Sequence, residues 1–152
     1  MHKIFTNQIL EVHNLLSFRG KVKQSELGGL SEDMEKKILA AGANKIGNPI
    51  CATYGMEQEY IDVDALIPID KKIENISKYT FRETIKIVNA IKLEYKGNPI
   101  GLKNACDELT KYMQKHNLQP ITVGYKVTKF IDSKKIGETE IDVYVGINPN
   151  IL

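Results

Sequence analysis

The chain contains two similar segments. The first reads Asn48-Pro49-Ile50-Cys51-Ala52-Thr53-Tyr54, and the second, 71 positions later, reads Gln119-Pro120-Ile121-Thr122-Val123-Gly124-Tyr125. At the same offset, three apolar residues of the first half align with apolar residues of the second: Val22 with Leu93, Met34 with Ala105, and Ile38 with Leu109. Similarity over this length indicates that the fold is built from two copies of one unit.

The match resumes with a longer offset near the end of each copy. Residues 60–69 resemble residues 138–147, 78 positions later. The second copy therefore has a longer connection near residues 131–135, and such length differences are typical of surface hairpins. We expect a single domain over residues 1–152, with repeat one at about 9–69, repeat two at about 80–148, and a linker between them.

Each copy is predicted to form a β-α-β-β unit. Strands are expected at residues 9–22, 50–54 and 60–69, and again at 81–95, 121–130 and 139–147. A single unit of this size has too little core to be stable alone, so the two copies are expected to share one. The sequence therefore predicts an α+β fold with a tandem repeat, pseudo-two-fold symmetry and antiparallel sheets. Two helices would cover one face, and a central ligand groove would lie where the copies meet.

Helix boundaries are predicted from capping residues and apolar spacing. Ser31 is the expected N-cap of the first helix, and Gly42 is its expected end. Asn117 and Pro120 are expected to close the second helix. The buried faces are predicted to carry Met34, Ile38 and Ala41 in the first helix and Leu102, Ala105, Leu109 and Tyr112 in the second.

The composition is that of an ordinary globular domain. Hydrophobic residues make up 42% and charged residues 26%, and the formal net charge is +2. Only two of the 21 basic residues are arginines and the lysines are scattered, which argues against nucleic-acid binding by this chain alone. Cys51 and Cys106 are too few for a disulfide scaffold and are read as buried free thiols. With no signal peptide and no membrane-length apolar run, a cytoplasmic protein is expected.

Acidic and tyrosine side chains share one face of the last strand of each copy. Because a strand sends alternate side chains to opposite faces, the apolar set faces the helix and the polar set faces away. Residues 58–69 and 137–147 contain no lysine or arginine. We therefore predict an acidic, partly aromatic groove for cationic or electron-poor amphiphiles, held by cation–π attraction and a carboxylate counter-charge. The side chains expected to face away from the helix are Tyr60, Asp62, Asp64 and Leu66 in copy one, and Glu138, Glu140, Asp142 and Tyr144 in copy two. For Asp62, Asp64 and Asp142, a solvated outer sheet face stays the alternative.

The sequence resembles the GyrI-like effector-binding family, whose members occur alone or attached to MerR-type and AraC-type transcription regulators. The resemblance runs from about Val12 to the end of the chain. Three elements carry it: a Gly47-x-Pro49 turn followed by Tyr54, the helix entry Gly97-x-x-x-x-Leu102-x-x-Ala105-x-x-x-Leu109, and the strand Thr139-Glu140-Ile141-x-Val143-x-Val145-x-Ile147.

The resemblance implies a central ligand cleft that contains Glu140, with Tyr54 and Tyr125 among its aromatic residues. Some family members are ligand sensors, and others look like hydrolases of reactive electrophilic compounds that use a cleft glutamate and tyrosine. The chain departs from the family at Gly124-Tyr125-Lys126, where Glu-x-Tyr or Tyr-Glu is common, and at Gly146, which replaces a usual proline. No helix-turn-helix region is found in the sequence, so this chain is not expected to be a DNA-binding regulator by itself.

Three functions follow as hypotheses. The first is a binding domain that senses or sequesters amphiphilic cationic or aromatic compounds, in the manner of multidrug-binding effector domains, with Glu140, Tyr54, Tyr125, Asp62, Tyr60, Asp142 and Tyr144 as ligand-binding residues. The second is a hydrolase with Glu140 as general base and Tyr125 as its partner. The third is an interaction or inhibitor module that docks on a protein partner, for which the segment 131–137 is a candidate.

No cofactor or metal is expected. His2, His13 and His116 do not have the spacing that gathers metal ligands, and His116 near a helix end is read as a dipole partner or surface residue. Gly28-Gly29 precedes a helix but lacks the Lys-Ser/Thr that a phosphate-binding loop needs.

Overall fold

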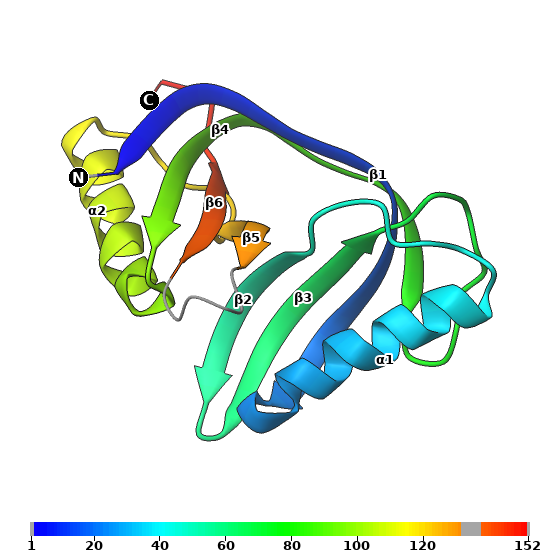
Figure 1. Ribbon diagram of the computed structural model, residues 1–152. Helices are drawn as coiled ribbons and strands as arrows, with labels where there is room; N and C mark the ends of the chain where they lie inside the picture. Colours follow the sequence, from blue (N-terminus) through cyan, green and yellow to red (C-terminus); the bar gives the residue numbers. More distant parts are fainter. Residues whose placement is uncertain (1, 132–137, 152) are drawn as a thin grey trace. The chain divides into compact units, whose positions relative to one another are not determined.

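The computed structural model describes residues 2–131 and 138–151. The connection expected near 131–135 and the candidate interaction segment 131–137 lie, apart from residue 131, outside the described residues. The described residues form six strands, paired antiparallel, and two α-helices, which confirms the predicted α+β class (Figure 1). The elements are β1 (Lys3–Lys23), η1 (Gln24–Glu26), α1 (Leu27–Ala40), β2 (Ile50–Glu57), β3 (Tyr60–Pro68), β4 (Thr80–Gly97), η2 (Pro99–Gly101), α2 (Leu102–Lys115), β5 (Tyr125–Ile131) and β6 (Thr139–Gly146).

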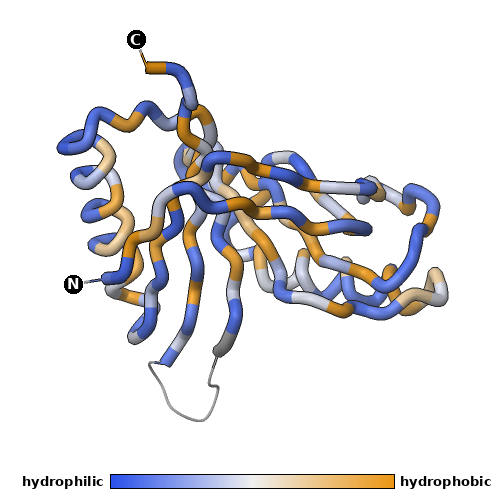
Figure 2. The backbone as a smooth tube through the Cα atoms, turned by 90° about the horizontal axis from the view of Figure 1, so that it is seen from above, coloured by the Kyte–Doolittle hydropathy of each residue, from blue (hydrophilic) through white to orange (hydrophobic). Residues whose placement is uncertain are grey.

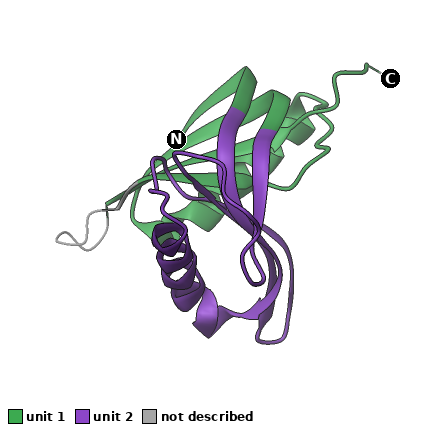
Figure 3. Cartoon of the chain, turned by 90° about the vertical axis from the view of Figure 1, so that its right-hand side faces the viewer, with its two compact units in different colours: residues 1–10, 86–152 green, residues 11–85 purple. Residues whose placement is uncertain are grey.

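The chain divides into two compact units (Figure 3). Unit 1 contains residues 1–10 and 86–152, and unit 2 contains residues 11–85. The long strands β1 and β4 therefore each contribute residues to both units. These bounds differ from the repeats expected at 9–69 and 80–148, because each unit includes the first part of a strand that continues into the other.

In unit 2, β3 lies between β1 and β2. Leu15–Lys23 of β1 pair with Tyr60–Pro68 of β3, and β2 pairs with the opposite edge of β3. Helix α1 covers one face, where its buried residues Leu30, Met34 and Ile38 pack against the apolar side chains of β1 and β3. The first residues of β4, up to Ile85, also belong to this unit, and the Ser17 hydroxyl donates a hydrogen bond of 2.9 Å to the Thr80 carbonyl oxygen.

Unit 1 has the same order of elements. Its central strand is β6, which pairs with β4 on one side and with β5 on the other. Ala105, Leu109 and Met113 of α2 are buried against apolar residues of β4 and β6. Figure 2 shows hydrophobic and hydrophilic positions alternating along the strands, as expected for a sheet with one covered face.

Helix α1 begins earlier than expected. Ser31 was the predicted N-cap, but the helix starts at Leu27, after a 3-10 turn, and Ser31 lies inside it. The reason is packing, because Leu30 is only 6% exposed and extends the buried stripe of Met34 and Ile38 one turn toward the N-terminus. The predicted end at Gly42 is confirmed by its φ of 79°.

The spacing of the two helices differs by four residues from the 71-position offset expected from the sequence. Helices α1 and α2 begin at Leu27 and Leu102, which are 75 positions apart, so counting from the helix starts matches Met34 with Leu109 and not with Ala105. A shift of four residues is close to one helical turn, and it leaves apolar residues on the same face of a helix. The apolar pattern of the helices therefore matches equally well at either offset.

Strands β2 and β5 each contain a β-bulge. In β2 the register with β3 shifts between Thr53 and Gly55, so Tyr54 is the extra residue. In β5 the register with β6 shifts between Thr128 and Phe130, so Lys129 is the extra residue. Bulges redirect side chains, and both of these residues belong to the polar clusters described below.

The two α-helices within the described ranges are 14 residues long, and neither has the length and apolar content that crossing a membrane requires.

Candidate functional site

The helix-free face of unit 1 is the side of β4, β6 and β5 opposite α2. Ile141, Val143 and Val145 point toward α2, so the alternating residues Glu140, Asp142 and Tyr144 point away from it, as the sequence predicted. Cross-strand pairs line up as rows across this face. The rows are Lys92–Tyr144–Tyr125, Glu94–Asp142–Val127 and Lys96–Glu140.

Two tyrosines lie side by side on this face. Tyr125 and Tyr144 are direct cross-strand partners, and Tyr125 is only 8% exposed. The Lys92 ammonium lies 6.0 Å from the Tyr144 ring centroid and 5.1 Å from the Phe5 ring centroid. Burial raises the pKa of Tyr144, and the neighbouring Asp142 charge adds to this rise, so the phenol stays protonated at neutral pH.

Asp142 is the buried carboxylate of this face. Its side chain is 10% exposed, and Lys129 Nζ lies 3.6 Å from its Oδ2. Its cross-strand partner on β4 is another acid, Glu94. Burial raises the pKa of Asp142, Glu94 adds to the rise, and Lys129 and Lys92 oppose it. The carboxylate is therefore only partly compensated by its surroundings.

Glu140 lies nearer the edge of the same face. Its side chain is 39% exposed and pairs at 3.4 Å with Lys96, which is itself 78% exposed. A pocket of about 150 Å³ opens beside it and is lined by Glu94, Tyr95, Lys96, Lys129, Glu140 and Asp142. Glu140 and Asp142 thus line one pocket, but Asp142 is the more buried of the two.

The helix-free face of unit 2 carries Asp62 and Asp64. Asp62 accepts a short hydrogen bond from Arg19, whose guanidinium carbon lies 3.9 Å from the centroid of the Tyr54 ring. The hydrogen bond to Asp62 is the largest cause of the raised pKa of Arg19. The Tyr54 ring thus stacks on Arg19, a residue of the protein itself.

Asp64 is buried with an incomplete set of partners. The residue is 4% exposed, and its Oδ2 accepts a hydrogen bond of 3.2 Å from Arg82 Nη1. Within residues 2–131 and 138–151, its Oδ1 is the one buried side-chain oxygen or nitrogen without a hydrogen-bond partner. Tyr60, at the start of β3, is 42% exposed and lines a separate pocket of about 170 Å³ with Asp62 and Met56.

The acidic residues of these faces are each paired with a basic residue. Asp62 and Asp64 pair with Arg19 and Arg82, while Glu140 and Asp142 pair with Lys96 and Lys129. The acidic strands β3 and β6 have no basic residues of their own, but other strands supply them. A pattern read along one strand does not show which residues of another strand lie opposite.

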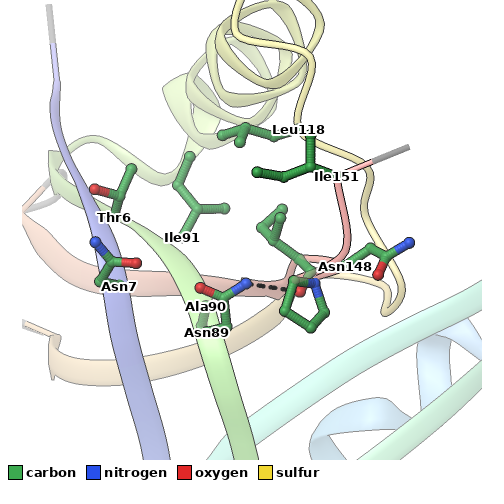
Figure 4. A pocket seen from close by; sticks show the side chains of 10 residues that line it. Thr6, Asn7, Asn89, Ala90, Ile91, Leu118, Asn148 and Ile151 are labelled. Atoms are coloured by element: carbon green, nitrogen blue, oxygen red, sulfur yellow. Dashed lines mark hydrogen bonds between the residues drawn. The ribbon is translucent and has the colours of Figure 1, made fainter.

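A further pocket of unit 1 lies where β4 meets the C-terminal segment (Figure 4). It has a volume of about 200 Å³ and is lined by Thr6, Asn7, Asn89, Ala90, Ile91, Leu118, Ile147, Asn148, Pro149 and Ile151. The Asn89 amide is already used, because it donates a hydrogen bond of 3.0 Å to the Ile147 carbonyl oxygen. This pocket has no ionisable side chain in its lining and offers no acid–base chemistry.

Nucleophile and metal chemistry have little support in the described parts of the chain. No group of three His, Cys, Asp or Glu side chains in those parts is arranged to hold a metal ion. Cys51 and Cys106 are partly buried free thiols, and burial raises the pKa of Cys106, so its thiolate form is disfavoured.

The sequence matches no protein-family model and no curated protein. Among solved structures, the EcmrR C-terminal domain superposes with a TM-score of 0.77 at 12% identity, over 97% of this chain and 98% of that one. EcmrR in its DNA complex gives a TM-score of 0.80 at 14% identity. That match covers 97% of this chain but only 57% of EcmrR, so this chain spans little more than half of that protein.

Two more distant structures share the fold. SAV2435 bound to tetraphenylphosphonium has a TM-score of 0.54 at 8% identity, over 98% of this chain and 94% of that one. A hydrolase from Listeria innocua also has a TM-score of 0.54, at 7% identity, over 93% and 91% of the two chains. At the level of fold, these matches agree with the resemblance to GyrI-like effector-binding domains. The chain therefore has the fold of the EcmrR C-terminal domain.

Proposed function

We propose that this chain is a small-molecule-binding domain that senses or sequesters amphiphilic, cationic or aromatic compounds. The observation that carries the proposal is the helix-free face of unit 1. There, the cross-strand partners Tyr125 and Tyr144 lie in the row next to Asp142, a buried carboxylate whose charge is only partly compensated. Aromatic faces and a partly buried anion are the groups that attract a weakly hydrated organic cation.

The structural neighbours support the same reading. SAV2435 is a protein of this fold that binds tetraphenylphosphonium, a cation with four aromatic rings. EcmrR combines this fold with DNA binding within a longer chain. By analogy, a ligand sensor of this type would work with a DNA-binding part supplied elsewhere.

We also propose that the two units are copies of one β-α-β-β motif. Their elements follow the same order, their helices are equally long, and the bulges at Tyr54 and Lys129 are 75 positions apart, like the helix starts. Equivalent backbone hydrogen bonds support this, since Ile69 N donates to Asn14 O in one unit and Ile147 N donates to Asn89 O in the other. The central groove between the copies, lined by residues of both, stays a prediction.

Calorimetric titration with tetraphenylphosphonium tests the proposed function. Asp142→Asn should weaken binding about tenfold, because it removes a buried counter-charge. Glu140→Gln should weaken it less, since Glu140 is half-exposed and paired with Lys96. Glu138→Gln, which removes the same charge from an exposed position, is the matched control and should change little.

Absence of measurable binding by the wild-type protein would refute the proposed function. Equal affinities for wild type and Asp142→Asn would show instead that the cation binds elsewhere.

The hydrolase hypothesis is the weaker one. One fold neighbour is a hydrolase, but Glu140, the predicted general base, is half-exposed and ion-paired with Lys96. A general base is best placed in a partly apolar setting that strengthens its hold on a proton. Asp142 meets that condition better than Glu140.

A further inference from the structure

We propose that Lys129 is a built-in occupant of the cation site formed by Asp142, and that a cationic ligand binds by displacing the Lys129 ammonium. Lys129 would then set the affinity of the site for cations. This inference rests on the proposed function, because it concerns how the same site chooses its ligand.

The position of Lys129 follows from the β-bulge of β5. An extra residue between Thr128 and Phe130 interrupts the register with β6 and redirects the Lys129 side chain. Its Nζ lies 3.6 Å from Asp142 Oδ2, which is an ion-pair distance but is longer than an ordinary N–H···O hydrogen bond. The pair is therefore an electrostatic contact with little directional bonding to hold it.

The two partners are unequally fixed. The Asp142 side chain is 10% exposed and sits on the central strand β6, whereas the Lys129 side chain is 43% exposed and extends from the bulge. A lysine ammonium is a compact, strongly hydrated charge on a flexible stem, so it regains water readily when it leaves such a contact. The buried carboxylate stays in place and needs a replacement cation.

The surroundings of Asp142 favour a second cation in place of the Lys129 ammonium over a carboxylate with no cation beside it. Glu94, its cross-strand partner, adds a second negative charge, and Lys92 pairs with Glu94 at 3.3 Å. Burial raises the pKa of Asp142 even with both lysines present, so the carboxylate is not fully compensated by Lys129. An organic cation that sheds water more easily than an ammonium would compensate it better.

Space for such a cation begins at Lys129 itself. The pocket of about 150 Å³ beside Asp142 has Lys129 as part of its wall, so moving this side chain outward enlarges the pocket. Unit 2 shows the contrasting case. There Arg19 is hydrogen-bonded to Asp62 and stacked on Tyr54, so that cation is held by two contacts and is harder to displace.

Titration calorimetry with tetraphenylphosphonium on Lys129→Met tests the inference. Methionine keeps the length of the side chain and removes the competing charge, so affinity should rise about tenfold. Lys45→Met is the matched control, because it makes the same change in net charge at the exposed pair with Glu35, outside the lining of this pocket, and should alter affinity less than about twofold. In an Asp142→Asn background, Lys129→Met should have no effect, since there is no longer a carboxylate for Lys129 to occupy.

The outcomes separate the two proposals. Equal gains for Lys129→Met and Lys45→Met, or unchanged or weaker binding by Lys129→Met, would overturn the role of Lys129 while leaving the binding function in place. A gain from Lys129→Met that persists in the Asp142→Asn background would also overturn it. If neither wild type nor Lys129→Met binds the cation, the inference and the proposed function both fail.

Discussion

Substitution of Gly146 by alanine should destabilise unit 1. A Cβ built on Gly146 would lie 2.9 Å from Thr122 Cγ2 and 3.1 Å from Ile87 Cγ2, and ordinary van der Waals contact begins at 3.4 Å. The Thr122 side chain cannot simply move aside. Its hydroxyl accepts a hydrogen bond of 2.8 Å from Gly146 N and donates one of 2.8 Å to the Val123 carbonyl oxygen.

The cost follows from these contacts. Overpacking typically costs about 1–3 kcal/mol, and a strained hydrogen bond adds up to about 1 kcal/mol. We therefore expect Gly146→Ala to lower the free energy of unfolding by about 2 kcal/mol. For a domain of this size, that corresponds to a fall in Tm of roughly 4–8 °C.

Differential scanning calorimetry on two further variants completes the test. Gly55→Ala is the control, because a Cβ at Gly55 meets no atom within 4 Å and should change Tm little. Thr122→Gly combined with Gly146→Ala should recover part of the loss, since the nearest clashing group is gone. Unit 2 contains a similar close contact, since a Cβ built on Gly47 would lie 3.0 Å from the Pro68 side chain. An unchanged Tm for Gly146→Ala, or no recovery in the double variant, would refute this reasoning.

Three further predictions concern stability and pH. Gly29→Ala should raise the free energy of unfolding by about 0.5–1 kcal/mol in chemical denaturation, because Gly29 is in α1 and a Cβ there meets no atom within 4 Å. Tyr79→Phe should lower Tm at neutral pH, because the Tyr79 hydroxyl donates a hydrogen bond to Asp33 and lowers the pKa of that carboxyl. The difference in Tm between wild type and Tyr79→Phe should shrink as the pH falls through this lowered pKa. Asp142→Asn should raise Tm at neutral pH, because burial raises the pKa of Asp142 and its charged form costs stability; the gain should vanish below the pKa of an unfolded aspartate, about 3.9. Thermal melts of wild type, Tyr79→Phe and Asp142→Asn from pH 3 to pH 8 check the last two predictions. A difference in Tm from wild type that does not change with pH would contradict them.

Much of the fold could be predicted from periodicity. Alternation along residues 139–147 correctly separated the helix-facing residues Ile141, Val143 and Val145 from Glu140 and Asp142. The helix faces were also predicted correctly, since Met34, Ile38 and Leu109 are buried. Periodicity did not determine the register along the helix, because apolar residues spaced by about one turn match themselves when shifted by four.

The candidate site was only partly predictable. Alternation brought Asp142 and Tyr144 to one face, and the structure adds Tyr125 as the cross-strand partner of Tyr144. The opposing charges of Arg19 and Lys129 could not be predicted, because strand pairing and bulges decide which residues lie opposite. The burial of Asp142 could not be predicted either, since burial depends on neighbouring strands and not on the motif.

A nuclear magnetic resonance titration with tetraphenylphosphonium that follows backbone amide shifts tests the proposed cation site most directly. We expect saturable shifts concentrated at Tyr125, Lys129, Asp142 and Tyr144, on strands β5 and β6. Shifts confined to the pocket around Asn89 and Asn148, or no shifts at all, would contradict the claim that the helix-free face of unit 1 binds the cation.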